Sequence, residues 1–218
     1  MPPKTKILLV DDHPLVREWL TNLINEEPDF EVCGSVGNTH EALGLIGTLL
    51  PRIVVVDISL DGSSGLELIK DVKATHPQVD MIVLSMHDEM LYAERAMRAG
   101  AAGYVMKREA TDKVLAAIRA VLQGGLYFNN AVNAMLAQKL VQGTGDQPAT
   151  IAALSDRELE VFQLLGRGYS TRQISEQMNV GFKTVHAYCA RIKEKLNLAN
   201  IHELVFHAVR WHESQQPR

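Results

Sequence analysis

Five short apolar runs alternate with longer amphipathic runs over residues 1–125, and this alternation leaves few folds open to the chain. The runs between the apolar segments repeat their apolar residues about every 3.6 positions, as amphipathic helices do. Near-continuous apolar strands joined by helices form a parallel sheet that is covered on both faces. We therefore predict an α/β domain with a doubly wound, five-stranded parallel sheet. The predicted strands are residues 6–10, 30–36, 53–56, 81–85 and 103–106.

The remainder of the chain has a different pattern. Residues 129–142 predict one further helix, and "GTGDQPATIA" at 143–152 has the Gly, Pro and polar content of a linker. Residues 153–213 predict four helices separated by brief turns. The predicted division is a first domain at 1–125, a linker helix and flexible linker at 126–152, and a smaller all-α domain at 153–218.

Charge is unevenly distributed between the two parts. Residues 1–148 carry 13 basic and 19 acidic side chains, a net charge of −6, whereas residues 149–218 carry 9 and 7, a net charge of +2. The split indicates two separate roles, although charge alone does not demonstrate a nucleic-acid partner.

The composition also favours a cytoplasmic protein without a membrane partner. No apolar run reaches the roughly 20 residues of a membrane helix, and the N-terminus lacks the pattern of a signal peptide. Cys33 and Cys189 are far apart and outside any metal-binding spacing, so we expect two buried thiols.

Charged and hydroxyl side chains stand where four of the predicted strands end. Asp11 and Asp12 follow the first strand, and Asp57 follows the third. Ser85 closes the fourth, and Lys107 follows the fifth. Ligands of an open parallel sheet bind outside the carboxyl ends of its strands, so these groups are expected to converge in one cleft. Adjacent carboxylates repel unless a cation joins them, and Mg²⁺ prefers oxygen ligands, so the set predicts a Mg²⁺ site with Asp57 as the phosphoryl acceptor.

No single residue of this set is diagnostic. An aspartate at a strand end is commonly a helix N-cap or a turn residue, and one lysine is commonly a solvated surface side chain. The prediction depends on five such residues at four strand ends of one sheet.

Residues 1–125 resemble the receiver domain of two-component response regulators, and "DDHP" at 11–14 is typical of the NarL/FixJ branch. The resemblance implies a flavodoxin-like fold and transfer of a phosphoryl group to Asp57 from a phosphohistidine on a sensor histidine kinase. It also implies that Asp12, Asp57 and the backbone carbonyl of Ser59 bind Mg²⁺, with Asp11 helping.

The same resemblance assigns three further roles. Ser85 and Lys107 would contact the phosphoryl group. Tyr104 occupies the position of the family's aromatic switch, although an ordinary, partly buried edge-strand tyrosine explains this residue equally well.

The second domain contains a helix-turn-helix pattern. Ser155 and Glu158 predict a capping box at the start of its first helix, and Ser170 is the predicted N-cap of the second. A third helix at 182–196 follows after a tight turn, and this arrangement is typical of DNA-binding proteins. Its spacing predicts an inward stripe of Val185, Cys189, Ile192 and Leu196.

The other face of this helix carries basic and small side chains suited to DNA. The predicted DNA contacts are Lys183, Thr184, His186, Ala187, Ala190, Arg191 and Lys195. Lys193 and Lys195 also suit a purely structural role, because cations stabilise the C-terminal end of a helix.

Residues 153–213 resemble the LuxR-type DNA-binding domain through the pattern "LSDRE…KTVHAYCARIKEKL". The resemblance implies that the helix at 182–196 enters the major groove of double-stranded DNA. This chain has His186, Tyr188 and Gly181 where the family usually has Lys, His and a Ser or Thr cap, so its salt sensitivity and base preference are expected to differ. In the family the last helix, here 200–213, pairs two domains on DNA as a homodimer. The residues on one side of that helix equally suit a core alone: Leu204, Ala208 and Trp211.

These observations predict a transcription regulator, not an enzyme, whose DNA binding depends on phosphorylation of Asp57. One alternative is a regulator that uses its first domain only to dimerise, independently of phosphorylation. Another is a phosphatase-like or isomerase-like enzyme, which would need a further acid–base group in the cleft. His13 and His87 are the nearby histidines, and His13 precedes Pro14 at a helix start, which favours a structural role.

Overall fold

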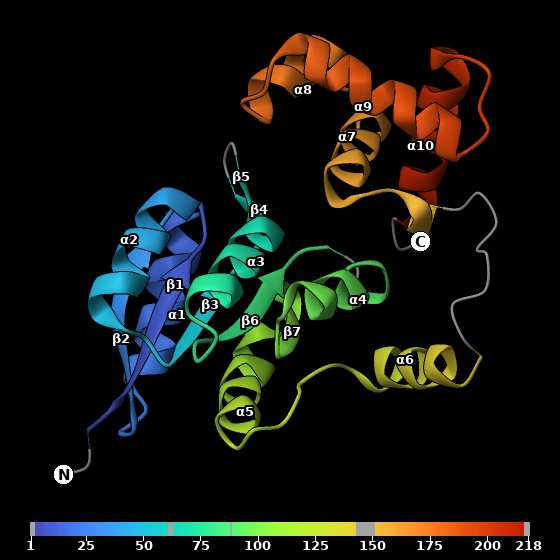
Figure 1. Ribbon diagram of the computed structural model, residues 1–218. Coiled ribbons are helices and arrows are strands. Elements are labelled where there is room, and N and C mark those ends of the chain that lie inside the picture. The colour runs from blue at the N-terminus through green and yellow to red at the C-terminus, as the bar shows by residue number, and fades with distance from the viewer. Residues whose placement is uncertain (1–2, 61–62, 88, 143–150, 216–218) are drawn as a thin grey trace. The chain divides into compact units, whose positions relative to one another are not determined.

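The computed structural model describes residues 3–60, 63–87, 89–142 and 151–215. The chain divides into two compact units, Met1–Val141 and Gln142–Arg218 (Figure 1). Most of the predicted flexible linker, residues 143–150, lies outside the described residues.

The first unit is built on the predicted five-stranded parallel sheet, and the α/β fold class is confirmed. The strands lie in the order β2-β1-β3-β6-β7, and all neighbours are parallel. This order makes the carboxyl ends of β1, β3, β6 and β7 adjacent, which is the edge at which the predicted polar residues stand. The strand bounds are β1 (Thr5–Val10), β2 (Phe30–Val36), β3 (Ile53–Val56), β6 (Asp80–Ser85) and β7 (Gly103–Met106).

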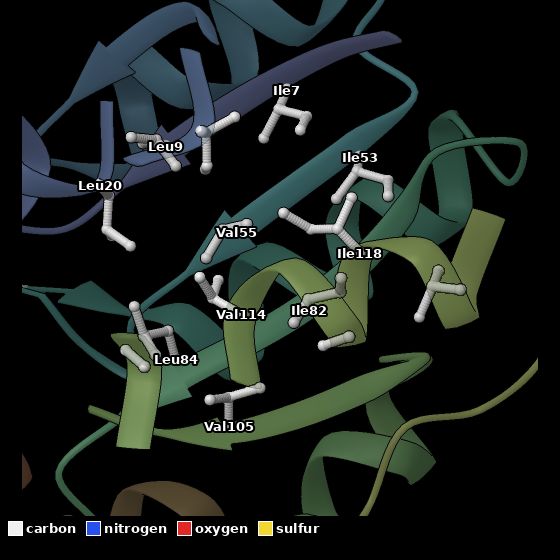
Figure 2. Packing of buried hydrophobic residues seen from close by; sticks show 14 of the residues in the cluster. Ile7, Leu9, Leu20, Ile53, Val55, Ile82, Leu84, Val105, Val114 and Ile118 are labelled. Atoms are coloured by element: carbon white, nitrogen blue, oxygen red, sulfur yellow. The ribbon is translucent and has the colours of Figure 1, made fainter. Parts of the chain in front are cut away.

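Helices cover both faces of this sheet because successive strand residues point to opposite sides and nearly all are apolar. Figure 2 shows one face, where Val114 and Ile118 of a helix pack on strand residues such as Val55 and Ile82. The alternate strand residues, such as Leu8 and Val54, are equally buried on the other face. The helices around the sheet are α1 (Pro14–Asn25), α2 (Thr39–Leu49), α3 (Gly65–Thr75), α4 (Glu89–Ala99) and α5 (Ala110–Leu122), and α6 (Asn130–Gln142) follows them in the chain. α1 and α5 supply the helical side of the core drawn in Figure 2.

The segment before α6 pairs with the edge of the sheet, which the sequence did not predict. The Tyr104 backbone N–H donates to the carbonyl of Tyr127 at 2.8 Å, and the Tyr127 N–H donates to the carbonyl of Ala102 at 2.9 Å. Glu89, at the start of α4, accepts hydrogen bonds from the backbone and side-chain nitrogens of Asn129 at 2.9 and 2.7 Å. The exposed edge of β7 is thereby covered, and the start of α6 is fastened to α4.

A short antiparallel hairpin, β4 (Ser59–Leu60) and β5 (Ser63–Ser64), follows β3 and was also not predicted. It returns the chain to the end of β3, where the Gly65 N–H donates to the carbonyl of Ile58 at 2.8 Å. A Cβ atom at Gly65 would lie 1.9 Å from the carbonyl oxygen of Asp57. Only glycine allows this approach without a shift of the backbone.

The second unit is helical throughout its described residues, as predicted. A 3₁₀ turn at Ile151–Ala153 precedes the helices α7 (Asp156–Gly166), α8 (Thr171–Gln177), α9 (Phe182–Lys195) and α10 (Ile201–Gln215). The capping box of Ser155 and Glu158 is confirmed, and Ser170 forms a second one with Gln173. No helix in the described part of the chain combines the length and apolar character that a bilayer crossing requires.

The core of the helical unit agrees with the predicted stripe except at its end. Val185, Cys189 and Ile192 are buried, whereas Leu196 is only partly buried. The rings of Phe162 and Trp211 pack with their centroids 5.8 Å apart. The expectation of two buried thiols is wrong for the first unit, because Cys33 on β2 is partly exposed and its thiol donates to the carbonyl of Ile7 at 3.4 Å.

Replacement of Gly65 by alanine is expected to destabilise the first unit by about 1–3 kcal/mol, because the added methyl group forces backbone atoms apart. The matched control is Gly44→Ala in α2, where nothing lies within 4 Å of an added Cβ and a mid-helix alanine is expected to stabilise by about 0.5–1 kcal/mol. Urea unfolding followed by Trp19 fluorescence in a Trp211→Phe background measures both. Equal stability of the two variants would contradict the close approach at Gly65.

Candidate functional site

Two adjacent strands bring the acidic residues together. Val10 and Val56, the last residues of β1 and β3, are register partners, and the Asp57 N–H donates to the carbonyl of Val10 at 2.9 Å. Asp11 and Asp57 therefore leave the sheet side by side, and both are buried.

Lys107, directly after β7, lies between these two carboxylates. Its Nζ is 2.6 Å from Asp11 Oδ2 and 2.7 Å from Asp57 Oδ2. Burial lowers the pKa of the Lys107 ammonium, but the charges and hydrogen bonds of the two aspartates outweigh burial and raise this pKa above its ordinary value. Lys107 is therefore charged at neutral pH and offsets part of the repulsion between the carboxylates.

The pKa of the Asp57 carboxyl is also raised, but here burial outweighs the neighbouring charges and hydrogen bonds. Burial is the largest cause, and the Asp11 carboxylate adds to it, while Lys107 and a hydrogen bond from Ser85 act against it. The raised pKa shows that the ionised Asp57 side chain is incompletely compensated by the protein, which suits a group that receives further positive charge.

A cluster of possible metal ligands surrounds this point. Atoms of Asp11, Asp12, His13 and Asp57 all lie within 4.8 Å of one another. Carboxylate oxygens at such spacing are the ligands that Mg²⁺ prefers, and the acidic cluster is typical of a Mg²⁺ site. His13 was not in the predicted set: its Nδ1 lies 2.6 Å from Asp12 Oδ1 and 3.1 Å from Asp11 Oδ1, so it holds the carboxylates in place.

The remaining predicted residues of the first unit are Ser59, Ser85 and Tyr104, and each of them contacts His87. Ser59 Oγ lies 2.6 Å from His87 Nε2, and the His87 N–H donates to Ser85 Oγ at 3.3 Å. The buried Tyr104 donates its hydroxyl hydrogen to the carbonyl of His87 at 2.9 Å. Sequence reasoning treated His87 only as a possible acid–base group, because the contact of its ring with Ser59 spans 28 residues.

The second candidate site is the exposed face of α9. All of its predicted DNA contacts are exposed: Lys183, Thr184, His186, Ala187, Ala190, Arg191 and Lys195. Gly181 is the N-cap and supplies no side-chain hydrogen bond, as predicted. Phe182, the first residue of α9, was missed by sequence reasoning and is 50% exposed.

Lys195 has a structural partner as well. Its Nζ lies 2.6 Å from Oε2 of Glu158, the buried member of the α7 capping box. This ion pair joins the end of α9 to the start of α7, so a DNA contact of Lys195 would have to form beside it.

Both units match known families. Residues 7–119 match the family model of the response regulator receiver domain, and residues 152–208 match that of the bacterial regulatory proteins of the luxR family. The chain is similar to the transcriptional activator protein ExaE of Pseudomonas putida, with 36% identity over 203 residues, covering 93% of this chain and 95% of that one. It is similar to the oxygen regulatory protein NreC of Staphylococcus carnosus, with 32% identity over 210 residues, covering 94% and 97%.

A solved structure of the response regulator RcsB of Salmonella typhimurium shares the fold. Its TM-score is 0.71 at 21% sequence identity, and the match covers 95% of this chain and 98% of RcsB. The chain belongs to the two-component response regulators that carry a LuxR-type helix-turn-helix domain. It is therefore a DNA-binding transcription regulator of the NarL/FixJ type and not an enzyme.

Replacement of Lys195 by methionine is expected to destabilise the helical unit by about 1–3 kcal/mol at neutral pH, because it leaves the buried Glu158 carboxylate without its cation. Although burial raises the pKa of Glu158, the bonds from Lys195 and Ser155 outweigh burial and lower this pKa. A lowered folded-state pKa stabilises above the unfolded pKa, and this stabilisation is lost as the pH falls through the folded pKa. The difference between wild type and variant is thus expected to shrink in acid.

The measurement is urea unfolding at several pH values, followed by Trp211 fluorescence in a Trp19→Phe background. The matched control is Lys193→Met, which removes the same charge from the same helix but leaves the ion pair of Lys195 intact. A loss that is equal in both variants, or that does not change with pH, would refute the role of the ion pair.

Proposed function

We propose that Asp57 accepts a phosphoryl group from a phosphohistidine on a sensor histidine kinase and that DNA binding depends on this modification. The observation that carries the proposal is the buried cluster in which Lys107 lies between Asp11 and Asp57. In the transfer, an Asp57 carboxylate oxygen attacks phosphorus, the nitrogen–phosphorus bond breaks, and the histidine nitrogen keeps the bonding electrons. The product is an acyl phosphate on Asp57.

Each neighbouring residue has a task in this reaction. Lys107 holds a positive charge next to the attacking oxygen, and Ser85 offers a hydroxyl hydrogen to the transferred group. Asp11, Asp12, Asp57 and the backbone carbonyl of Ser59 would hold Mg²⁺, which when bound neutralises charge on the phosphoryl oxygens. Tyr104 is proposed to act as the switch, because its hydroxyl is bonded to the residue that also contacts Ser85.

The helical unit is proposed to bind DNA. We propose that α9 lies in the major groove of double-stranded DNA and that its exposed basic residues contact the DNA. RcsB has been solved as dimers bound to DNA, and this supports a homodimer of the present chain on DNA. The resemblance to the LuxR-type domain implies α10 as the pairing helix. The proposed division is a receiver at 1–125, a connection at 126–152 and the DNA-binding domain at 153–218, in a cytoplasmic protein.

Mg²⁺ is expected to raise the urea midpoint of the receiver, because a ligand that binds only the folded state stabilises that state. At a Mg²⁺ concentration ten times the Kd, the free energy of unfolding is expected to rise by about 1.4 kcal/mol. Asp12→Asn is expected to abolish this increment. Asp112→Asn, an exposed residue in the first turn of α5, is the control and should retain it. A wild-type urea midpoint that does not rise with Mg²⁺, or a rise that persists in Asp12→Asn, would contradict the Mg²⁺ site.

Treatment of the full chain with acetyl phosphate and Mg²⁺ is expected to add one phosphoryl group, seen by intact-protein mass spectrometry. Asp57→Asn should remain unlabelled and Asp112→Asn should be labelled like the wild type. Lys107→Met is expected to slow labelling, because the cation beside the acceptor is lost. Undiminished labelling of Asp57→Asn would sink the assignment of the acceptor.

The same samples distinguish the two modes of regulation. Binding to genomic DNA fragments, read by sequencing, is expected to strengthen on phosphorylation of the wild type and to stay unchanged for Asp57→Asn. Equal binding with and without the phosphodonor would instead support a regulator that uses its receiver only to dimerise.

A further inference from the structure

Phe182, the first residue of α9, has a half-exposed aromatic ring. Phe182 is 50% exposed, although the helix buries the apolar side chains of Val185, Cys189 and Ile192 against the rest of the unit. Exposure of an aromatic side chain forgoes the hydrophobic stabilisation that burial would give. Packing within the described part of the helical unit therefore covers only about half of this side chain.

The exposed ring is held in place by a second ring. The centroids of Phe182 and His186 are 4.3 Å apart and their planes meet at 65°, an edge-to-face arrangement. The two residues are four positions apart and so lie on the same side of the helix, one turn from each other. A ring fixed in this way loses less conformational entropy when it binds a partner than a freely rotating side chain does.

The charges around the ring indicate which partner it meets. Lys183 and Arg191 are exposed on the same helix, and the first turn of α9 contains no acidic residue. An apolar ring next to the exposed Lys183, on a helix that also exposes Arg191 two turns further on, matches the major groove of DNA. Phosphates border that groove, and the C5-methyl group of thymine is the apolar feature of its base edges. The first turn of a recognition helix is also the part that reaches base edges.

We propose that Phe182, positioned by His186, contacts the C5-methyl group of a thymine and makes DNA binding depend on a thymine in each half-site. The inference rests on the proposed DNA binding by α9 and adds a base preference to it. Phe182 is thereby a specificity-determining residue and His186 a positioning residue.

The test removes the methyl group and nothing else. Full-length protein treated with acetyl phosphate first selects its preferred site from random double-stranded DNA, and each thymine of that site is then replaced by deoxyuridine, which keeps the base pairing. One replacement in one half-site is expected to weaken wild-type binding about three- to fivefold, the value of one buried methyl group. Phe182→Ala is expected to bind the thymine site more weakly and to give equal affinities for the two DNAs.

Two further variants separate this effect from a general loss of affinity. Lys183→Ala is expected to weaken binding to both DNAs by the same factor and to retain the deoxyuridine penalty, because a phosphate contact does not sense the methyl group. His186→Ala is expected to reduce the penalty, because the ring loses its support. Phe182 is exposed, so its alanine variant is expected to keep the wild-type unfolding midpoint, which Trp211 fluorescence checks.

The outcomes distinguish the inference from the function on which it rests. A wild-type protein that selects no sequence, with or without phosphodonor, would overturn the DNA-binding proposal and this inference with it. A selected site without thymine, a site whose deoxyuridine forms all bind equally, or a penalty that persists in Phe182→Ala would overturn the thymine contact alone. A change in oligomeric state of Phe182→Ala without any change in the deoxyuridine penalty would assign the ring to a contact between copies of the chain and would also overturn it.

Discussion

The repulsion among three aspartates at the edge of one sheet is the constraint on which the first unit depends. When Asp11, Asp12 and Asp57 are ionised they carry three negative charges. Lys107 places one positive charge between the carboxylates of Asp11 and Asp57. These four side chains alone leave a deficit close to the charge of one divalent ion, and Arg17, whose guanidinium donates to the backbone carbonyl of Asp11, lies at the same edge. Buried ion pairs seldom stabilise a fold by themselves, because desolvation offsets their attraction. The cluster is therefore better explained by what it binds than by what it contributes to folding.

The contacts of this cluster continue, bond by bond, to the place where the chain leaves the receiver. Ser85 accepts from His87, Tyr104 donates to His87, and the backbone of Tyr104 pairs with Tyr127. Two residues later, Asn129 caps the start of α6 and is held by Glu89. The Tyr104 side chain thus connects His87 with β7, the strand that carries the segment before α6.

The strands and helices, which have periodic apolar residues, and the polar residues at strand ends could be predicted from the sequence. Contacts between residues far apart in the chain could not. Five apolar runs were enough to predict the sheet, and the polar residues at the strand ends were enough to predict which side chains meet. The bond between Ser59 and His87 and the ion pair between Glu158 and Lys195 join residues 28 and 37 positions apart, and neither leaves a periodic trace. The pairing of Tyr127 with β7 was missed because one paired residue has no alternation to detect.

The two lysines at the end of α9 show why counting charges in the sequence overestimates the number of cations that this helix has available for a partner. Lys193 and Lys195 look equivalent in the sequence, yet Lys195 is held by the buried Glu158. Each phosphate contact that is lost lowers the salt dependence of binding by about one unit of slope. A helix with fewer available cations must obtain more of its affinity and selectivity from uncharged contacts. The exposed rings of Phe182 and His186, on the side of α9 that also carries Lys183, are among the groups of this helix that can supply them.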